Sequence, residues 1–153
     1  SVDEQSMAPL VIQTCVFQLV QRVRACVSAL RGTRALYDYV RQQAKISHPL
    51  IKVGLIGDLE IRWNTTFIMI DRFITYRFII IKANTQPFRI PDTTSVQQAK
   101  IGARKFKFDN EDWSHLKDLQ SVLKPFFVAT KIISARDYPT LAAAYAGELA
   151  MYQ

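Results

Sequence analysis

Residues able to bind metals or carry out redox chemistry are scarce in this sequence. It contains two cysteines and two histidines among 153 residues. Cys15 and Cys26 lie eleven positions apart in one apolar segment, a spacing that matches no zinc or redox motif. His48 and His115 are distant from them and from each other along the chain. We therefore expect two small buried thiols in a reducing compartment, with no metal ion, no cofactor and no nucleophile–base pair.

Long uninterrupted apolar runs are also missing. The longest apolar stretch, residues 67–81, contains Asp71, Arg72 and Arg77. A helix that crosses a bilayer needs about 20 consecutive apolar residues, so no membrane partner is expected. The chain starts with neither Met nor a basic-then-apolar leader. We therefore expect no signal peptide and a start inside a longer protein.

With 153 residues, 49% of them apolar, a single helical region over 1–153 is expected rather than two domains.

Acidic residues are rare in one third of the chain. Residues 1–60 hold seven basic and five acidic side chains, residues 61–108 nine and two, and residues 109–153 four and six, so the differences are +2, +7 and −2. This concentration favours a local electropositive face that binds nucleic acid, and a soluble face with poor charge balance is the alternative.

Apolar periodicity predicts a mainly α-helical fold. Apolar residues at intervals of four and three in the first segment indicate a helix packed on one side. Gly32 suits the C-terminal cap of this helix, and Thr33 suits the N-cap of a second helix. The second helix is expected to end at His48-Pro49. The stripe of the first helix consists of Ile12, Val16, Leu19, Val23, Cys26 and Leu30.

The remaining helices are predicted from caps and stripes. Asn64 is expected to cap a helix that runs to about Lys82, and Asp109 another that breaks or kinks at Pro125. Residues 84–108 lack periodicity and predict a basic connecting loop, and residues 140–152 predict an Ala-rich helix. The residues expected to point inward in the helix after Asn64 are Phe67, Ile70, Phe73, Ile74, Phe78 and Ile81.

Two blocks of the sequence resemble the hAT (hobo/Activator) transposase family. Residues 58–73 are similar to the family pattern D-x-x-T-R-W-N-S-T-x-x-M-L-x-R-L. The second block, residues 113–141, contains segments similar to the family's L-K-P-F, A-T and Y-P-T-L elements. The chain departs from the family at Gln18, where a C-x-x-H element would carry histidine, and at Ile61, where threonine is usual. The matches in the first block are Arg62, Trp63, Asn64, Thr66, Met69 and Arg72.

The resemblance implies the helical insertion region of an RNase H-like transposase core. The family cuts DNA with two aspartates before the insertion and a glutamate after it, which gather around divalent metal ions. None of these three can be assigned in this chain, so we expect no enzyme activity of its own. The resemblance implies DNA as partner and the nucleus as location, with no small-molecule substrate, and leaves a homo-oligomer open. A transposase-derived module for protein interaction, without DNA binding, is the alternative function.

Candidate DNA-binding residues fall in two places. Arg62 and Trp63 suit contact with a phosphate and stacking on an unpaired base, or alternatively Trp63 anchors the helix start while Arg62 pairs with Asp58. Arg72 belongs to the same motif. Residues 100–108 mix basic and aromatic side chains, which suits phosphate contact with stacking, and a solvated loop edge held by its two phenylalanines is the alternative. The basic candidates there are Lys100, Arg104, Lys105 and Lys107.

Overall fold

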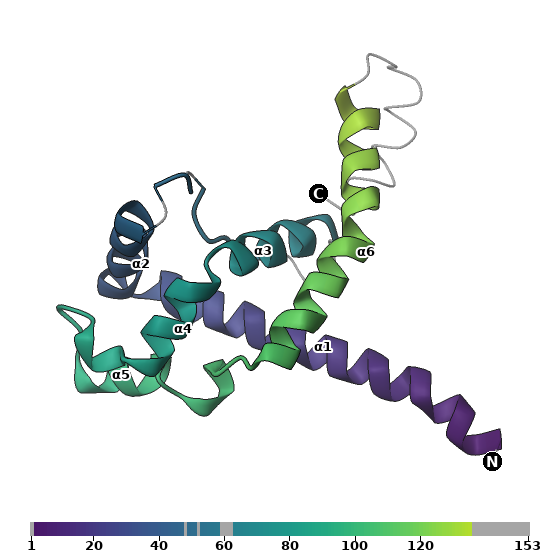
Figure 1. Ribbon diagram of the computed structural model, residues 1–153, viewed down its shortest axis with the longest axis horizontal. Helices are drawn as coiled ribbons and strands as arrows, with labels where there is room; N and C mark the ends of the chain where they lie inside the picture. Colours follow the sequence, from purple (N-terminus) through teal and green to yellow (C-terminus); the bar gives the residue numbers. More distant parts are fainter. Residues whose placement is uncertain (1, 48, 52, 59–62, 136–153) are drawn as a thin grey trace.

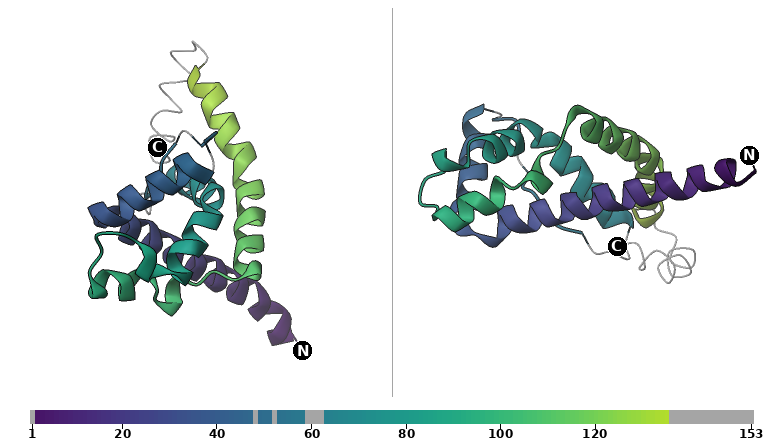
Figure 2. Two further views of the ribbon diagram at one scale, coloured as in Figure 1. Left: turned by 60° about the vertical axis from the view of Figure 1, so that its left-hand side comes forward. Right: turned by 90° about the horizontal axis from the view of Figure 1, so that it is seen from below.

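The computed structural model describes residues 2–47, 49–51, 53–58 and 63–135, with side chains from residue 13 to residue 133 (Figure 1). All regular elements within these ranges are helices, so the predicted mainly α fold is confirmed. Helices α2, α4 and α5 gather at the C-terminal end of α1, whereas the N-terminal end of α1 and the C-terminal end of α6 project from this group (Figures 1 and 2). None of the described helices is long and apolar enough to cross a membrane.

Helices α1 (Val2–Gly32) and α2 (Arg34–Ser47) follow the predicted stripe closely. Leu19, Val23, Cys26 and Leu30 are buried, and α2 ends immediately before His48-Pro49 as expected. Gly32, which was predicted to cap the end of this helix, is instead the last residue of α1, and its φ is not positive. The two helices pack against each other across this tight corner.

The single helix predicted after Asn64 is divided in two. Helix α3 (Trp63–Thr75) is followed by Tyr76, where φ is −90° and ψ is 12°, and then by α4 (Arg77–Thr85). The Tyr76 hydroxyl donates a hydrogen bond of 2.8 Å to the Val53 carbonyl, which holds the junction. The break changes which positions face the core: Phe78 is 68% exposed, contrary to prediction. Ile79, Ile80 and Ala83 are buried in its place.

The predicted connecting loop over residues 84–108 is wrong in detail. The segment forms the 3-10 turn η1 (Pro87–Arg89), helix α5 (Ser95–Ile101) and the 3-10 turn η2 (Arg104–Phe106). Thr94 caps α5, since its Oγ1 accepts a hydrogen bond of 3.2 Å from the Gln97 amide and the Gln97 side chain accepts one of 2.9 Å from the Thr94 amide. The segment is ordered because Ile90, Ile101, Phe106 and Phe108 are buried in the core.

Helix α6 (Asn110–Ala135) begins as predicted but continues differently. Asp109 caps it as expected, because its Oδ1 accepts a hydrogen bond of 2.7 Å from the Asp112 amide. The break predicted at Pro125 is absent and the helix runs through it. Packing on α3 on both sides of the proline maintains the helix, with Trp113 stacked 5.2 Å from Phe73 and Phe127 4.6 Å from Phe67. The helix predicted at 140–152 lies outside the described residues.

Candidate nucleic-acid interface

Residues 100–107, called the basic segment below, present four exposed cations. Lys100 lies in the last turn of α5, Arg104 and Lys105 form η2, and Lys107 follows it. All four side chains are exposed to solvent, whereas Phe106 is buried. The alternation in the sequence predicts charges and rings on opposite sides of an extended segment, but the backbone is a 3-10 turn and the Lys105 ammonium lies 5.0 Å from the centre of the Phe106 ring.

The aromatic residues of this region do not offer faces for stacking on bases. Phe106 and Phe108 are only 2% and 7% exposed. Phe108 packs against Phe73 and Trp113, with ring centroids 5.1 and 5.6 Å away. The burial of both rings contradicts the predicted stacking on bases, whereas contact of the exposed cations with phosphate stays a prediction. The two rings anchor the segment in the core.

Arg22 of α1 fastens the basic segment to the body of the protein. Its Nε donates a hydrogen bond of 3.0 Å to the Lys105 carbonyl, and one terminal nitrogen donates one of 2.9 Å to the Lys107 carbonyl. The other terminal nitrogen pairs with Asp112 at 3.1 Å. The sequence contains no signal for this arrangement, because the partners lie 83 to 90 positions away.

Acidic residues and a further cation bound the basic segment at the start of α6. Asp109 and Glu111 are exposed, whereas the Asp112 charge is compensated by Arg22. Arg77 donates a hydrogen bond of 3.2 Å to Asn110 Oδ1, and its guanidinium lies 5.3 Å from the Trp113 ring centre. The run of exposed cations in the basic segment therefore ends at Lys107, where exposed acidic residues begin.

The motif residues predicted to contact DNA serve the packing of α3. Trp63 is the first residue of α3, is half-buried, and meets the Phe126 ring of α6 edge-on at 6.0 Å. Arg72 donates a hydrogen bond of 3.1 Å to the Gly54 carbonyl and so fixes the loop over residues 53–58. These contacts agree with Trp63 as an anchor. Arg62 lies outside the described residues.

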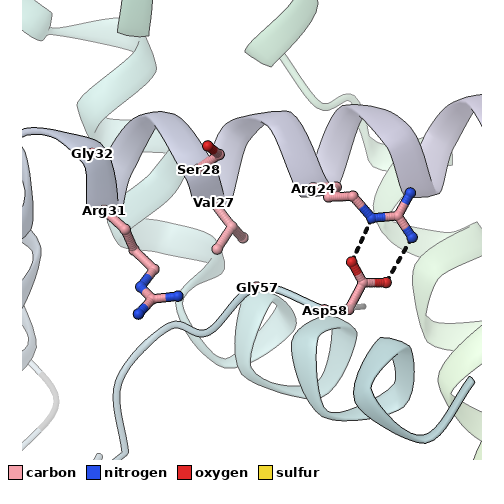
Figure 3. A pocket seen from close by; sticks show the side chains of 7 residues that line it. All are labelled: Arg24, Val27, Ser28, Arg31, Gly32, Gly57 and Asp58. Carbon is pink, nitrogen blue, oxygen red and sulfur yellow. Dashed lines mark hydrogen bonds and ion pairs between the residues drawn. The ribbon is translucent and has the colours of Figure 1, made fainter. Parts of the chain in front are cut away.

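Asp58 has a partner that the sequence did not predict. Its carboxylate accepts hydrogen bonds from two nitrogens of Arg24, one of them at 2.7 Å, and from Thr66 Oγ1 at 2.6 Å (Figure 3). The Asp58 side chain is fully buried. Burial by itself would raise the pKa of this carboxyl, but the hydrogen bonds from Arg24 and Thr66 outweigh burial and hold the pKa below its ordinary value.

Asn64 does not cap α3 as predicted. The helix begins one residue earlier, at Trp63, so Asn64 lies inside its first turn and is buried. The Asn64 Oδ1 atom is buried without a hydrogen-bond partner among the described residues. A capping residue in the N-cap position would instead direct this oxygen to the amides of the following turn.

The cysteines divide between surface and core. Cys26 is buried as predicted, and burial raises the pKa of its thiol to about 12. Cys15 is exposed, contrary to prediction, because it lies beside the packed stripe on the projecting part of α1. The described part of the chain holds no group of three or more His, Cys, Asp or Glu side chains placed to bind a metal ion.

Comparisons with protein-family models, with curated proteins and with solved structures each find no match to this chain.

Proposed function

We propose that this chain is the DNA-binding helical part of a hAT-type transposase, or of a protein derived from one, without catalytic carboxylates of its own. The sequence blocks at 58–73 and 113–141 support the family, and the helical fold agrees with an insertion region within an RNase H-like core. The proposal places the protein in the nucleus with DNA as its partner.

The observation that carries DNA binding is the arrangement of the basic segment. Lys100, Arg104, Lys105 and Lys107 are exposed within eight residues, while their backbone is held by Arg22 and by buried phenylalanines. Cations that are fixed before binding lose less conformational entropy when they meet phosphates. Such contacts position a protein on DNA without reading its sequence, so affinity should depend strongly on salt and weakly on base order.

The test is binding of the purified chain to hairpin and duplex DNA over a salt series. The variant changes Lys100, Arg104, Lys105 and Lys107 to alanine. We expect its slope of log affinity against log salt to fall by about 0.9 for each duplex phosphate that the variant no longer neutralises. No binding at low salt by the folded wild-type chain, or equal binding by the variant, would contradict the proposal.

A second variant controls for total charge. Arg34, Arg41, Lys45 and Lys117 are also exposed, but they lie on α2 and α6 and do not belong to the basic segment. Changing these four to alanine removes the same charge from other surfaces. This variant should retain most of the affinity and salt dependence of the wild-type chain, whereas an equal decrease in both variants would indicate attraction by net charge alone.

A protein-interaction module is the second candidate, and the surface of α6 supports it. The second half of this helix exposes several large apolar side chains on the projecting part of the molecule. Concentration-dependent self-association without DNA affinity, measured by sedimentation, would favour this function over the first. A Val122→Ser, Val128→Ser double variant should then weaken association. The exposed apolar residues of this surface are Val122, Phe126, Val128 and Ile132.

A further inference from the structure

An open cavity of about 470 Å³ lies between α1 and the loop over residues 53–58 (Figure 3). It belongs to neither the basic segment nor the exposed face of α6. Val27, which is fully buried, belongs to its wall. The other side chains that define the cavity are Arg24, Ser28, Arg31 and Asp58, and Gly57 lies on the loop side.

The charge of this cavity comes from Arg31. Asp58 is fully buried and its carboxylate is held by two nitrogens of Arg24, so the charges of this pair compensate each other. Arg31 makes no hydrogen bond or ion pair with another described residue, and its side chain is exposed. The cavity wall therefore carries one paired cation and anion, Arg24 and Asp58, and one exposed cation, Arg31, that can meet a ligand.

Gly57 lies close to the guanidinium of Arg31. A Cβ atom added at Gly57 would lie 3.9 Å from a terminal nitrogen of Arg31, in ordinary contact. Figure 3 shows the guanidinium directed from α1 toward this part of the loop. The planar fork of donors is thus presented at the cavity, where it can bind two oxygens of one anion.

The cavity lies on the opposite side of α1 from the basic segment. Arg31 follows Arg22 by nine positions, which is about 2.5 helical turns, so the two arginines leave the helix in opposite directions. Arg24 precedes Arg31 by seven positions, about two turns, and shares its side. A ligand in this cavity is therefore not an extension of a strand lying along Lys100–Lys107.

We propose that this cavity binds a phosphate monoester, with Arg31 holding the phosphate and the Arg24–Asp58 pair keeping the wall in place. A monoester carries close to two negative charges near neutral pH, and its oxygens match the guanidinium fork. The cavity volume of about 470 Å³ is many times that of one water molecule, so an organic group attached to the phosphate can also enter the cavity. The source of the phosphate is either a free nucleotide or the 5′ end of a nucleic-acid strand.

The experiment titrates AMP, adenosine and inorganic phosphate into the wild-type chain, Arg31→Gln and Arg34→Gln by calorimetry. Arg34 is an exposed arginine outside this cavity and serves as the matched control. We expect AMP and phosphate to bind both the wild-type chain and R34Q, and adenosine to bind neither of these proteins. The affinity of R31Q for AMP should be at least about tenfold lower than that of the wild-type chain. Because Arg31 is exposed, the unliganded Tm of R31Q should match that of the wild-type chain.

Two results would overturn the proposal: AMP affinity unchanged in R31Q, or adenosine binding as well as AMP. The source is decided with one oligonucleotide carrying either a 5′-phosphate or a 5′-hydroxyl. A 5′-phosphate advantage that R31Q abolishes identifies a strand end, whereas AMP binding without that advantage identifies a free nucleotide. The quadruple variant of the basic segment should keep its AMP affinity, so failure of DNA binding and failure of this site are distinguishable.

Discussion

The guanidinium of Arg22 lies 4.7 Å from the centre of the Phe108 ring. One arginine thus combines a contact with a buried anchor and hydrogen bonds to the backbone that carries Lys105 and Lys107. The position of the exposed charges depends on this contact between the first helix and a segment more than 80 residues later. Substitution of Arg22 therefore tests directly whether these contacts hold the basic segment in position.

Arg22→Leu should lower the free energy of unfolding by about 1–3 kcal/mol, because it removes the hydrogen bonds to two carbonyls and the ion pair with Asp112. Urea unfolding measures this change, with Arg34→Gln as a control at an exposed position. Hydrogen exchange should also quicken at the Phe106 and Lys107 amides, which close the η2 turn. Unchanged exchange at these amides would show that the phenylalanines alone order the segment.

Asp58→Asn should destabilise the fold at neutral pH by about 2–3 kcal/mol, because it leaves Arg24 largely buried without its charged partner. The effect has a defined pH dependence. The folded-state pKa of Asp58 is below its ordinary value of 3.8, so this stabilisation is fully present above that value and is lost as pH falls through the lower folded pKa.

Unfolding free energies of the wild-type chain and Asp58→Asn should therefore differ by a constant amount between about pH 7 and pH 5 and converge below the ordinary carboxyl pKa. Thr66→Val is a milder companion change, because it removes one hydrogen bond and leaves the ion pair. A difference that stays constant down to about pH 2 would contradict the assignment of this titration to Asp58.

The two cysteines should differ in reactivity toward iodoacetamide. Cys15 is exposed and should be alkylated in the folded protein near pH 8. Cys26 is buried with a pKa of about 12, so its thiol should react only after unfolding. Mass spectrometry of the native protein should find one added group, and Cys15→Ser should find none. Rapid double modification under native conditions would contradict the burial of Cys26.

Pro125→Ala should stabilise the protein. The helix continues through this exposed position, where proline removes the hydrogen bond to the carbonyl of Ser121 and crowds it. Alanine restores the amide, and a gain of about 1–3 kcal/mol is expected. Thermal unfolding followed by circular dichroism measures the gain, with exposed Lys124→Ala as the neighbouring control. A decrease in stability would mean that the proline supports the bend or packing of α6.

Long amphipathic helices were predictable from the sequence because one apolar stripe determines their packing. Leu19, Val23, Cys26 and Leu30 of the α1 stripe are buried as expected, and Val16 is half-buried. The junction at Tyr76 was not predictable from this pattern. The surrounding run is apolar on nearly all sides, so its sequence does not show that the side facing the core changes between α3 and α4. Exposure of Phe78 is the result.

The region 84–108 was mistaken for a loop because its elements are too short to show a period. Helix α5 has seven residues, and the buried side chains on either side of it are unevenly spaced. Thr94 followed by Gln97 was a usable signal, since this spacing forms a capping box. The exposed cations were predictable from charge concentration, whereas Arg22 and the Arg24–Asp58 pair depend on contacts between distant parts of the chain.

The Arg22 contacts also set an order of events during synthesis of the chain. Helices α1 and α2 adjoin in sequence and can pair as soon as both have left the ribosome. The basic segment can be fastened only after Asp112 has been made, because its clamp joins residues 83 to 90 positions apart. A nascent or prematurely terminated chain therefore carries the same lysines and arginines without the fixed spacing that the finished protein gives them.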